Sequence, residues 1–134
     1  DRAEISGVYH RRLRVLFEEH QSDIVDAMSD FADLARQGYE AMTGGHPERL
    51  PELIDANFDL RNRIFHVADE NYRMVQQARR VGAAAKFAGS GGAIVGTYED
   101  EAMYDALEKS LADIGCSVIR PDIPADGDGE PAYV

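Results

Sequence analysis

The chain has 134 residues, and 14 Lys and Arg against 25 Asp and Glu give it a formal net charge of −11. This length is that of one ordinary domain, and a hydrophobic fraction of 44% is enough to bury a core. The acidic excess repels a phosphate backbone and no apolar run approaches the length of about 20 residues that a membrane span needs, so we expect neither nucleic acid nor membrane as a partner.

Apolar residues recur at helical spacing through the first half of the chain. Spacings of three and four predict a helix beginning near Val8 and a second one that is capped by Ser22, runs to about Thr43 and stops at the Gly-Gly pair 44–45. A third helix is predicted in the segment that His46-Pro47 opens, where mostly apolar residues from Leu50 to Ile64 share one side. A fourth is predicted over residues 71–81, with a glycine at position 82 as its stop.

After position 82 the composition changes to small and β-branched residues. Residues 83–87 and 93–98 read as two strands joined by a glycine loop. A helix follows, for which Thr97 and Asp100 suggest a capping pair, and it ends at Gly115. The run Ser117 to Arg120 predicts a short final strand.

This order of elements predicts the fold class. Two strands joined by a short loop pair antiparallel, and a strand-helix-strand crossover makes the last strand parallel to one of them. We therefore expect an α+β, ferredoxin-like (split βαβ) domain over residues 1–121, with helices packed on a small, mostly antiparallel sheet. A further strand could come from Ile5 to Tyr9 or from sequence beyond this chain. The acidic residues 122–134 predict a loosely ordered tail.

The strongest chemical signal is the glycine loop at Gly89, Ser90, Gly91 and Gly92. Three glycines and a serine in four positions allow backbone N–H groups to approach an anion closely, which suggests phosphate handling. The loop matches neither the P-loop pattern nor the dinucleotide fingerprint, because a strand rather than a helix follows it. A glycine-rich hairpin without any ligand is the alternative.

Asn57 and Arg61 are four residues apart and share one side of the third predicted helix. An asparagine on a mostly apolar helical face needs hydrogen-bond partners, and an arginine can hold a carboxylate through two parallel hydrogen bonds. A ligand would satisfy both. The alternative is a core asparagine paired with backbone, together with a surface ion pair such as Asp59 with Arg63.

The remaining reactive residues suggest no further site. The four histidines show no paired metal-ligand spacing, so we expect no metal site; they are His10, His20, His46 and His66. Cys116 is the single cysteine and reads as a packing thiol, which together with the lack of a secretory signal predicts a cytoplasmic protein.

The combination of these motifs resembles a known family. The run 81–93, containing Lys86-Phe87-Ala88-Gly-Ser-Gly-Gly-Ala, resembles the C-terminal signature of the GHMP small-molecule kinases. The helix motif Asn57-Phe-Asp-Leu-Arg61 before it is most similar to the glucuronokinase branch. The resemblance covers most of residues 6–121. Ala88 departs from the pattern, because relatives commonly have threonine there.

The resemblance implies a C-terminal, substrate-side domain of an ATP-dependent kinase that uses Mg²⁺ and phosphorylates a sugar or sugar acid, with glucuronate to glucuronate 1-phosphate favoured. Its partner would be the N-terminal GHMP kinase domain of the same polypeptide, which holds ATP and the catalytic residues. This chain alone is then expected to be inactive. The glycine loop becomes phosphate-proximal, and Asn57, Arg61 and Lys86 become candidates for substrate binding.

Two alternatives stay open from the sequence. The acceptor could be of the mevalonate, galactose or heptose type, because the branch depends on few helix residues. The chain could also be a non-catalytic, ferredoxin-like ligand-binding module. Such a module would bind a metabolite or self-associate without any upstream domain.

Overall fold

The structure is a computed structural model that describes residues 11, 14–19, 21–65, 67–89 and 91–122. The predicted strand from Ile5 to Tyr9 and all of the predicted tail except Asp122 therefore lie outside the described residues. Within them the chain is α+β: it is mostly helical, with a small antiparallel sheet of two strands.

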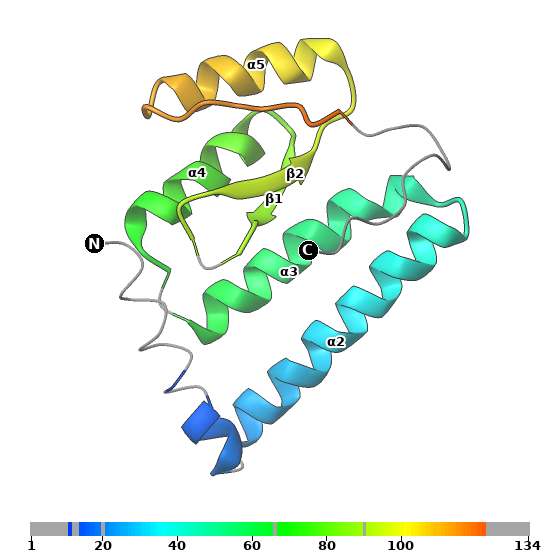
Figure 1. Cartoon of the computed structure of the whole chain (residues 1–134), viewed down its shortest axis with the longest axis vertical. Helices are drawn as coiled ribbons and strands as arrows, with labels where there is room; N and C mark the ends of the chain where they lie inside the picture. Colours follow the sequence, from blue (N-terminus) through cyan, green and yellow to red (C-terminus); the bar gives the residue numbers. More distant parts are fainter. Residues whose placement is uncertain (1–10, 12–13, 20, 66, 90, 123–134) are drawn as a thin grey trace, which may run out of the picture.

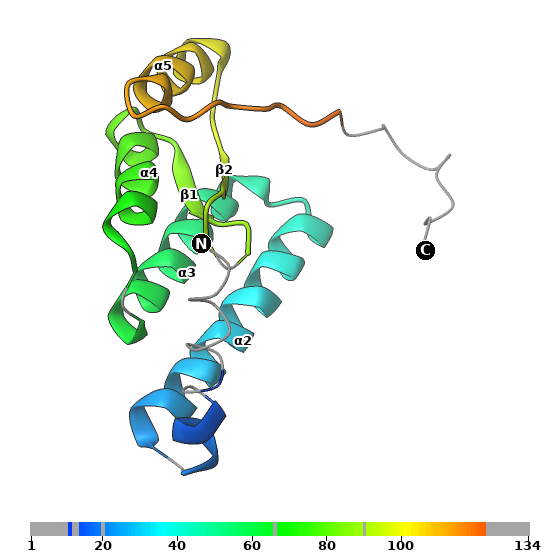
Figure 2. The same cartoon turned by 60° about the vertical axis from the view of Figure 1, so that its left-hand side comes forward.

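The long helices α2 (Ser22–Thr43) and α3 (Leu50–Ile64) form a helical hairpin, joined through the short 3₁₀ helix η1 (Pro47–Arg49). The two helices lie side by side in both views (Figure 1, Figure 2). The predicted third helix is confirmed; the segment that His46-Pro47 opens begins with η1, and α3 itself starts at Leu50. Proline at the second position of α3 suits a helix start, since the backbone N–H that proline lacks has no helical partner there.

The second half of the chain packs against α3. Helix α4 (Asp69–Arg80) leads into the hairpin of β1 (Ala84–Phe87) and β2 (Ile94–Thr97), and α5 (Glu101–Ala112) packs on α4. The strands pair antiparallel, with Ala84 opposite Thr97 and Phe87 opposite Ile94. The predicted strand-loop-strand hairpin is thereby confirmed. Gly82, with φ +92°, makes the turn between α4 and β1.

The core lies where α3, α4 and β1 meet. Phe58 of α3 and Val75 of α4 are completely buried, and the Phe58 ring packs edge-on against Phe87 at 5.5 Å between centroids. Val67, Ala78, Ala83 and Ala85 complete this cluster. The core therefore holds the end of β1, where the glycine loop begins, against the middle of α3.

The predicted final strand is wrong. Residues 116–121 leave α5 as an extended segment, but in the described part of the chain residues 117–121 form no backbone hydrogen bond with any strand. A backbone contact at one end and a side-chain contact near the other end hold the segment in place. The Cys116 N–H donates to the Leu111 carbonyl at 3.0 Å, and Arg120 forms two hydrogen bonds with Glu101 at 3.0 and 2.8 Å. Of the elements expected for a ferredoxin-like arrangement after α4, the described residues form the hairpin and the helix that follows it.

Three predicted helix starts also change. Ser22 is the first residue of α2 rather than its cap, and the capping position belongs to Gln21. Helix α4 begins two residues earlier than predicted, at Asp69. Asp100 by itself caps α5, because its carboxylate accepts from the Met103 N–H at 2.8 Å, while no described residue hydrogen-bonds the Thr97 hydroxyl.

Candidate functional site

The glycine loop crosses from β1 to β2 in backbone conformations that require glycine. Gly91 has φ +124° and Gly92 has φ +80°, a region that residues with a Cβ rarely adopt. Gly89 has no such requirement, and a Cβ there would meet no atom within 4 Å. Ser90, the fourth predicted loop residue, lies outside the described residues.

Asn71, on the first turn of α4, holds this loop. Its Oδ1 accepts a hydrogen bond from the Gly92 N–H at 2.9 Å. A Cβ on Gly91 would lie 2.8 Å from the Asn71 Nδ2, so the loop and the amide fit closely. The sequence patterns do not single out Asn71, because its 21-residue separation from the loop gives no local signal.

Arg61 lies beside the start of the loop. Its guanidinium stacks over the ring of Phe87, the last residue of β1, at 4.8 Å, and over the ring of Phe65 at 5.4 Å. The group is half-buried, and burial lowers the pKa of Arg61 below its usual value. In the described part of the chain, no carboxylate pairs with it and no carbonyl accepts a hydrogen bond from it.

The other two predicted site residues, Asn57 and Lys86, lie on opposite sides of β1. Asn57 is half-buried one turn before Arg61 on α3, and none of the described residues hydrogen-bonds its side-chain amide. Lys86 donates through its Nζ to the Phe87 carbonyl at 3.3 Å. Because neighbouring side chains on a strand point to opposite faces, Lys86 leaves β1 on the face away from Phe87. The structure thus groups Asn57 and Arg61 on one side of β1 and places Lys86 on the other.

An ion-pair network fixes α3 relative to β1 and α4. The Asp55 Oδ1 accepts from the Ala85 N–H and from Arg79 Nε, each at 3.1 Å, and Arg79 Nη1 reaches Asp59 at 2.7 Å. Arg79 also stacks over Phe58 at 5.2 Å. The pair Asp59–Arg63 that the sequence suggested does not form, because Asp59 pairs with Arg79 and Arg63 lies 3.7 Å from Asp30. The network positions Arg61 without contacting it.

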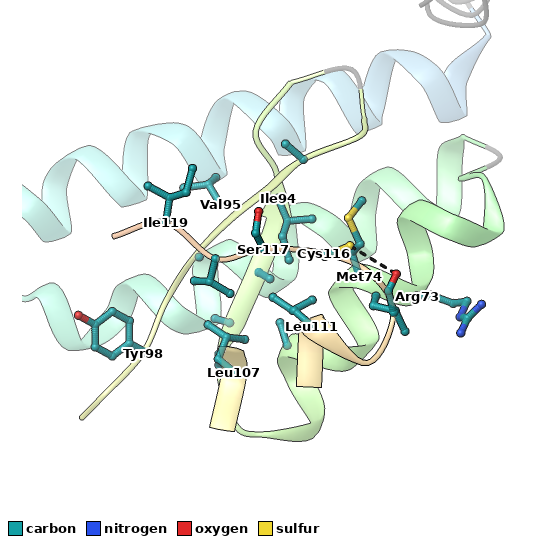
Figure 3. Close-up of a pocket in the computed structure, with 18 of the residues that line it drawn as sticks. Arg73, Met74, Ile94, Val95, Tyr98, Leu107, Leu111, Cys116, Ser117 and Ile119 are labelled. Carbon is teal, nitrogen blue, oxygen red and sulfur yellow. Dashed lines mark hydrogen bonds between the residues drawn. The ribbon is translucent and has the colours of Figure 1, made fainter. Parts of the chain in front are cut away.

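A groove of about 810 Å³ opens between β2, α5 and the extended segment 116–121. Its walls are mainly apolar, and Ile94, Leu107 and Leu111 lie in its centre (Figure 3). Arg61 and Asn57 do not line it. The groove and the Arg61 site are therefore separate features of the molecule.

Among the described residues, no group of three or more His, Cys, Asp or Glu side chains could hold a metal ion. None of the described helices is long and apolar enough to cross a bilayer. His46 lies exposed beside Glu48, and the other three histidines lie outside the described residues.

Comparison with known proteins identifies relatives. Over 95 residues, or 67% of this chain, the sequence is 41% identical to Glucuronokinase 1 of Arabidopsis thaliana and covers 26% of that protein. The match to Probable glucuronokinase 2 of the same plant is also 41% identical over 95 residues and covers 25% of it. The chain is glucuronokinase-like over two thirds of its length.

The names of these relatives indicate that the chain is related to kinases. The chain spans about a quarter of the length of each relative. No protein-family model matches the chain, and no solved structure does.

Proposed function

We propose that this chain is the C-terminal, substrate-side domain of a GHMP-type sugar kinase that transfers a phosphoryl group from ATP to a sugar acid, with glucuronate as the favoured acceptor. The single observation that carries the proposal is the half-buried guanidinium of Arg61 beside the glycine loop, for which the described residues provide no anionic partner. The similarity to glucuronokinases supports it and gives no support to a mevalonate or heptose acceptor or to a non-catalytic module.

Arg61 has the properties expected of a carboxylate receptor. A buried cation without an anion is costly, and the described residues supply none. The rings of Phe87 and Phe65 restrict the guanidinium while leaving its N–H groups available, because ring stacking uses the π face. A planar carboxylate would accept two parallel hydrogen bonds from this fork. The Asn57 amide, one turn away, can bind a neighbouring hydroxyl.

The glycine loop then provides backbone donors close to the transferred phosphoryl group. Gly91 and Gly92 adopt conformations in which successive N–H groups can form a concave anion site. The Gly92 N–H already donates to the side-chain oxygen of Asn71. The donors that remain for a phosphate are therefore the N–H groups of the residues next to Gly92 in the loop. Lys86 contributes charge from the opposite face and does not share the acceptor with Arg61.

The described residues do not form a Mg²⁺ site, because no group of three metal-ligating side chains occurs among them. We therefore assign no step of metal chemistry to this chain. ATP, Mg²⁺ and the catalytic residues are placed on an N-terminal domain of the same polypeptide, consistent with the greater length of the relatives. Phosphoryl transfer depends on positioning and charge stabilisation, so one domain by itself should not turn over.

The test is an ATP-consumption assay on the intact parent protein with glucuronate, galacturonate, galactose and mevalonate. Arg61→Leu should lower kcat/KM for the sugar acid by about 10- to 100-fold, the effect of losing hydrogen bonds to a charged group, and change the neutral sugar little. Arg63→Leu is the matched control, since Arg63 lies on the same helix with its side chain exposed. Equal losses for acid and neutral sugars, or turnover by the 134-residue chain alone, would contradict the proposal.

A further inference from the structure

Arg120 shows how an arginine that lies over aromatic rings binds a carboxylate in this chain. Its guanidinium carbon lies 5.2 Å from the ring centroid of Tyr98 and 4.1 Å from that of Tyr104. Its Nη1 and Nη2 donate to the two carboxylate oxygens of Glu101, at 3.0 and 2.8 Å. Stacking on rings uses the face of a guanidinium and hydrogen bonding uses its edge, so both contacts form together.

Arg61 has similar aromatic surroundings without the carboxylate. Its guanidinium carbon lies 5.4 Å from the ring centroid of Phe65 and 4.8 Å from that of Phe87. None of the described carboxylates bonds to it, and the carboxylate nearest in the sequence, that of Asp59, is bound to Arg79. The edge of the Arg61 guanidinium is therefore available for a carboxylate that another molecule supplies.

The two arginines also differ in how their charge is balanced. The hydrogen bond to Glu101 raises the pKa of Arg120, because an ion pair favours the charged form. Burial lowers the pKa of Arg61, because the described residues supply no anion to offset the loss of water. A carboxylate ligand would stabilise Arg61 as Glu101 stabilises Arg120.

The positions of both rings beside Arg61 are set by the fold. The Phe65 N–H donates to the Arg61 carbonyl at 2.8 Å, where α3 ends, so Phe65 follows directly from the helix. Phe87 is 6% exposed and packs edge-on against Phe58 in the core, at 5.5 Å between centroids. A ligand would therefore meet a guanidinium that is already restricted, which lowers the entropy lost on binding.

The charge of the site matches a carboxylate better than a phosphate. Arg61 supplies one positive charge, and a sugar carboxylate carries one negative charge. A phosphate monoester carries about two negative charges at neutral pH. The second charge would stay unbalanced in a half-buried site of a chain whose net charge is already −11. The site therefore favours a sugar acid over a phosphorylated sugar.

We infer that Arg61, with the rings of Phe65 and Phe87, is a complete carboxylate site, so that this chain binds a sugar acid by itself, without nucleotide and without the rest of the kinase. The inference rests on the proposed function, which supplies the sugar acid as ligand. It adds that acceptor binding does not depend on ATP, while phosphoryl transfer needs the remainder of the protein.

The experiment is an NMR titration of the 134-residue chain, without nucleotide, with three sugars that differ at carbon 6. Glucuronate has a carboxylate there, glucose a neutral CH₂OH group and glucose 6-phosphate a phosphate ester. The amides of Phe65 and Phe87 should shift and saturate with glucuronate. The affinity for glucose and for glucose 6-phosphate should be lower by about tenfold or more, the effect of losing a hydrogen-bonded ion pair.

Two variants on α3 test which charge binds the ligand. Arg61→Leu should weaken glucuronate binding by about tenfold or more. Arg63→Leu is the matched control, because it removes the same charge from the same helix at a side chain that is 68% exposed, and it should leave the affinity unchanged. The amide of Val75, which is fully buried, reports whether each variant keeps its fold.

Variants of Phe65 test the contribution of the ring. Phe65 is only partly buried, so its replacement should leave the chain folded. Phe65→Leu keeps an apolar side chain without a ring and should weaken glucuronate binding by about two- to tenfold, the range of a cation–π contact. Phe65→Tyr retains the ring and should bind glucuronate like the unaltered chain.

The inference is overturned if the chain shows no saturable shift with glucuronate, if glucose or glucose 6-phosphate binds equally well, or if Arg61→Leu and Arg63→Leu lose the same affinity. The ATP-consumption assay on the intact parent separates this failure from failure of the proposed function. A parent that phosphorylates glucuronate, beside a chain that does not bind it, would leave the function standing and remove only the independent site. A parent that does not phosphorylate glucuronate would contradict the proposed function itself.

Discussion

One carboxylate oxygen of Asp55 accepts hydrogen bonds both from the backbone N–H of Ala85 and from the guanidinium of Arg79, each at 3.1 Å. Through this atom α3 binds β1 and α4 at once. The oxygen stands where a neighbouring strand would offer a carbonyl, so it satisfies an N–H that the small sheet would otherwise leave unpaired.

Replacing Asp55 should therefore destabilise the chain. Asp55→Ala leaves the Ala85 N–H and the Arg79 Nε without their acceptor, and we expect a loss of about 1–3 kcal/mol in the free energy of unfolding. Urea denaturation followed by circular dichroism measures it. Asp59→Ala is the control: the Asp59 side chain is 61% exposed, so its removal should cost at most about 1 kcal/mol. Similar losses in the two variants would show that Asp55 has no special role.

Strands β1 and β2 approach each other closely at Gly96, and this leads to a second prediction. A Cβ at this position would collide with the Ala84 carbonyl oxygen, which belongs to the backbone of β1 and cannot rotate away. Gly96→Ala should force the strands apart and destabilise the chain by roughly 1–3 kcal/mol, the usual range for overpacking. Thermal unfolding measures it.

Gly89→Ala is the matched control for Gly96→Ala. A Cβ at Gly89 meets nothing within 4 Å and the residue has no positive φ, so the melting temperature should stay within the error of the measurement. Gly89→Ala in the intact parent is then informative about function. A loss of kinase activity with unchanged stability would indicate that a ligand approaches the backbone there.

Asn71 should control the order of the glycine loop. Asn71→Ala removes the acceptor of the Gly92 N–H, and we expect faster backbone motion at Gly91 and Gly92 in ¹⁵N relaxation, with a stability loss of about 1 kcal/mol. Asn71→Asp retains the oxygen and should keep the loop ordered. If the alanine variant relaxes like the unaltered chain, the loop is ordered by its own backbone.

The contact between Arg120 and Glu101 predicts a pH dependence of the segment 116–121. The hydrogen bond from Arg120 holds the pKa of Glu101 below its usual value, so the contact is complete above that usual value and is lost as the pH falls through the lowered one. The amide chemical shift of Ile119 should report the change during an acid titration. Glu101→Gln should abolish the transition at Ile119, and its persistence would assign the titration to another group.

The sequence predicts the elements whose signals are local. Helix α3 follows from apolar spacing, and the β1–β2 hairpin follows from a run of small residues and a β-branched run on either side of a glycine loop. The prediction of a final strand is wrong, and the reason is physical. Residues 117–120 have strand composition, but a strand exists only where a partner edge is near, and Arg120 anchors them to α5 instead.

The same limit applies to the candidate site, where only contacts between residues close in sequence could be predicted. Spacing alone brought Asn57 and Arg61 together, since residues four apart share a helical face. It could not show that Phe87 supports the Arg61 guanidinium, or that Asn71 fastens the glycine loop, because both contacts join residues more than 20 positions apart. It also could not separate Lys86 from Arg61, because that depends on which face of β1 meets α3.

The unequal edges of the hairpin bear on how this chain would aggregate. Fibrils grow when each added molecule offers a fresh strand edge to the next. Among the described residues β1 is closed by α3, so two copies that join through β2 would leave no free edge at either end of the sheet that these residues form. Association by this route stops at a two-fold dimer, which gives the exposed strand a built-in protection against polymer growth.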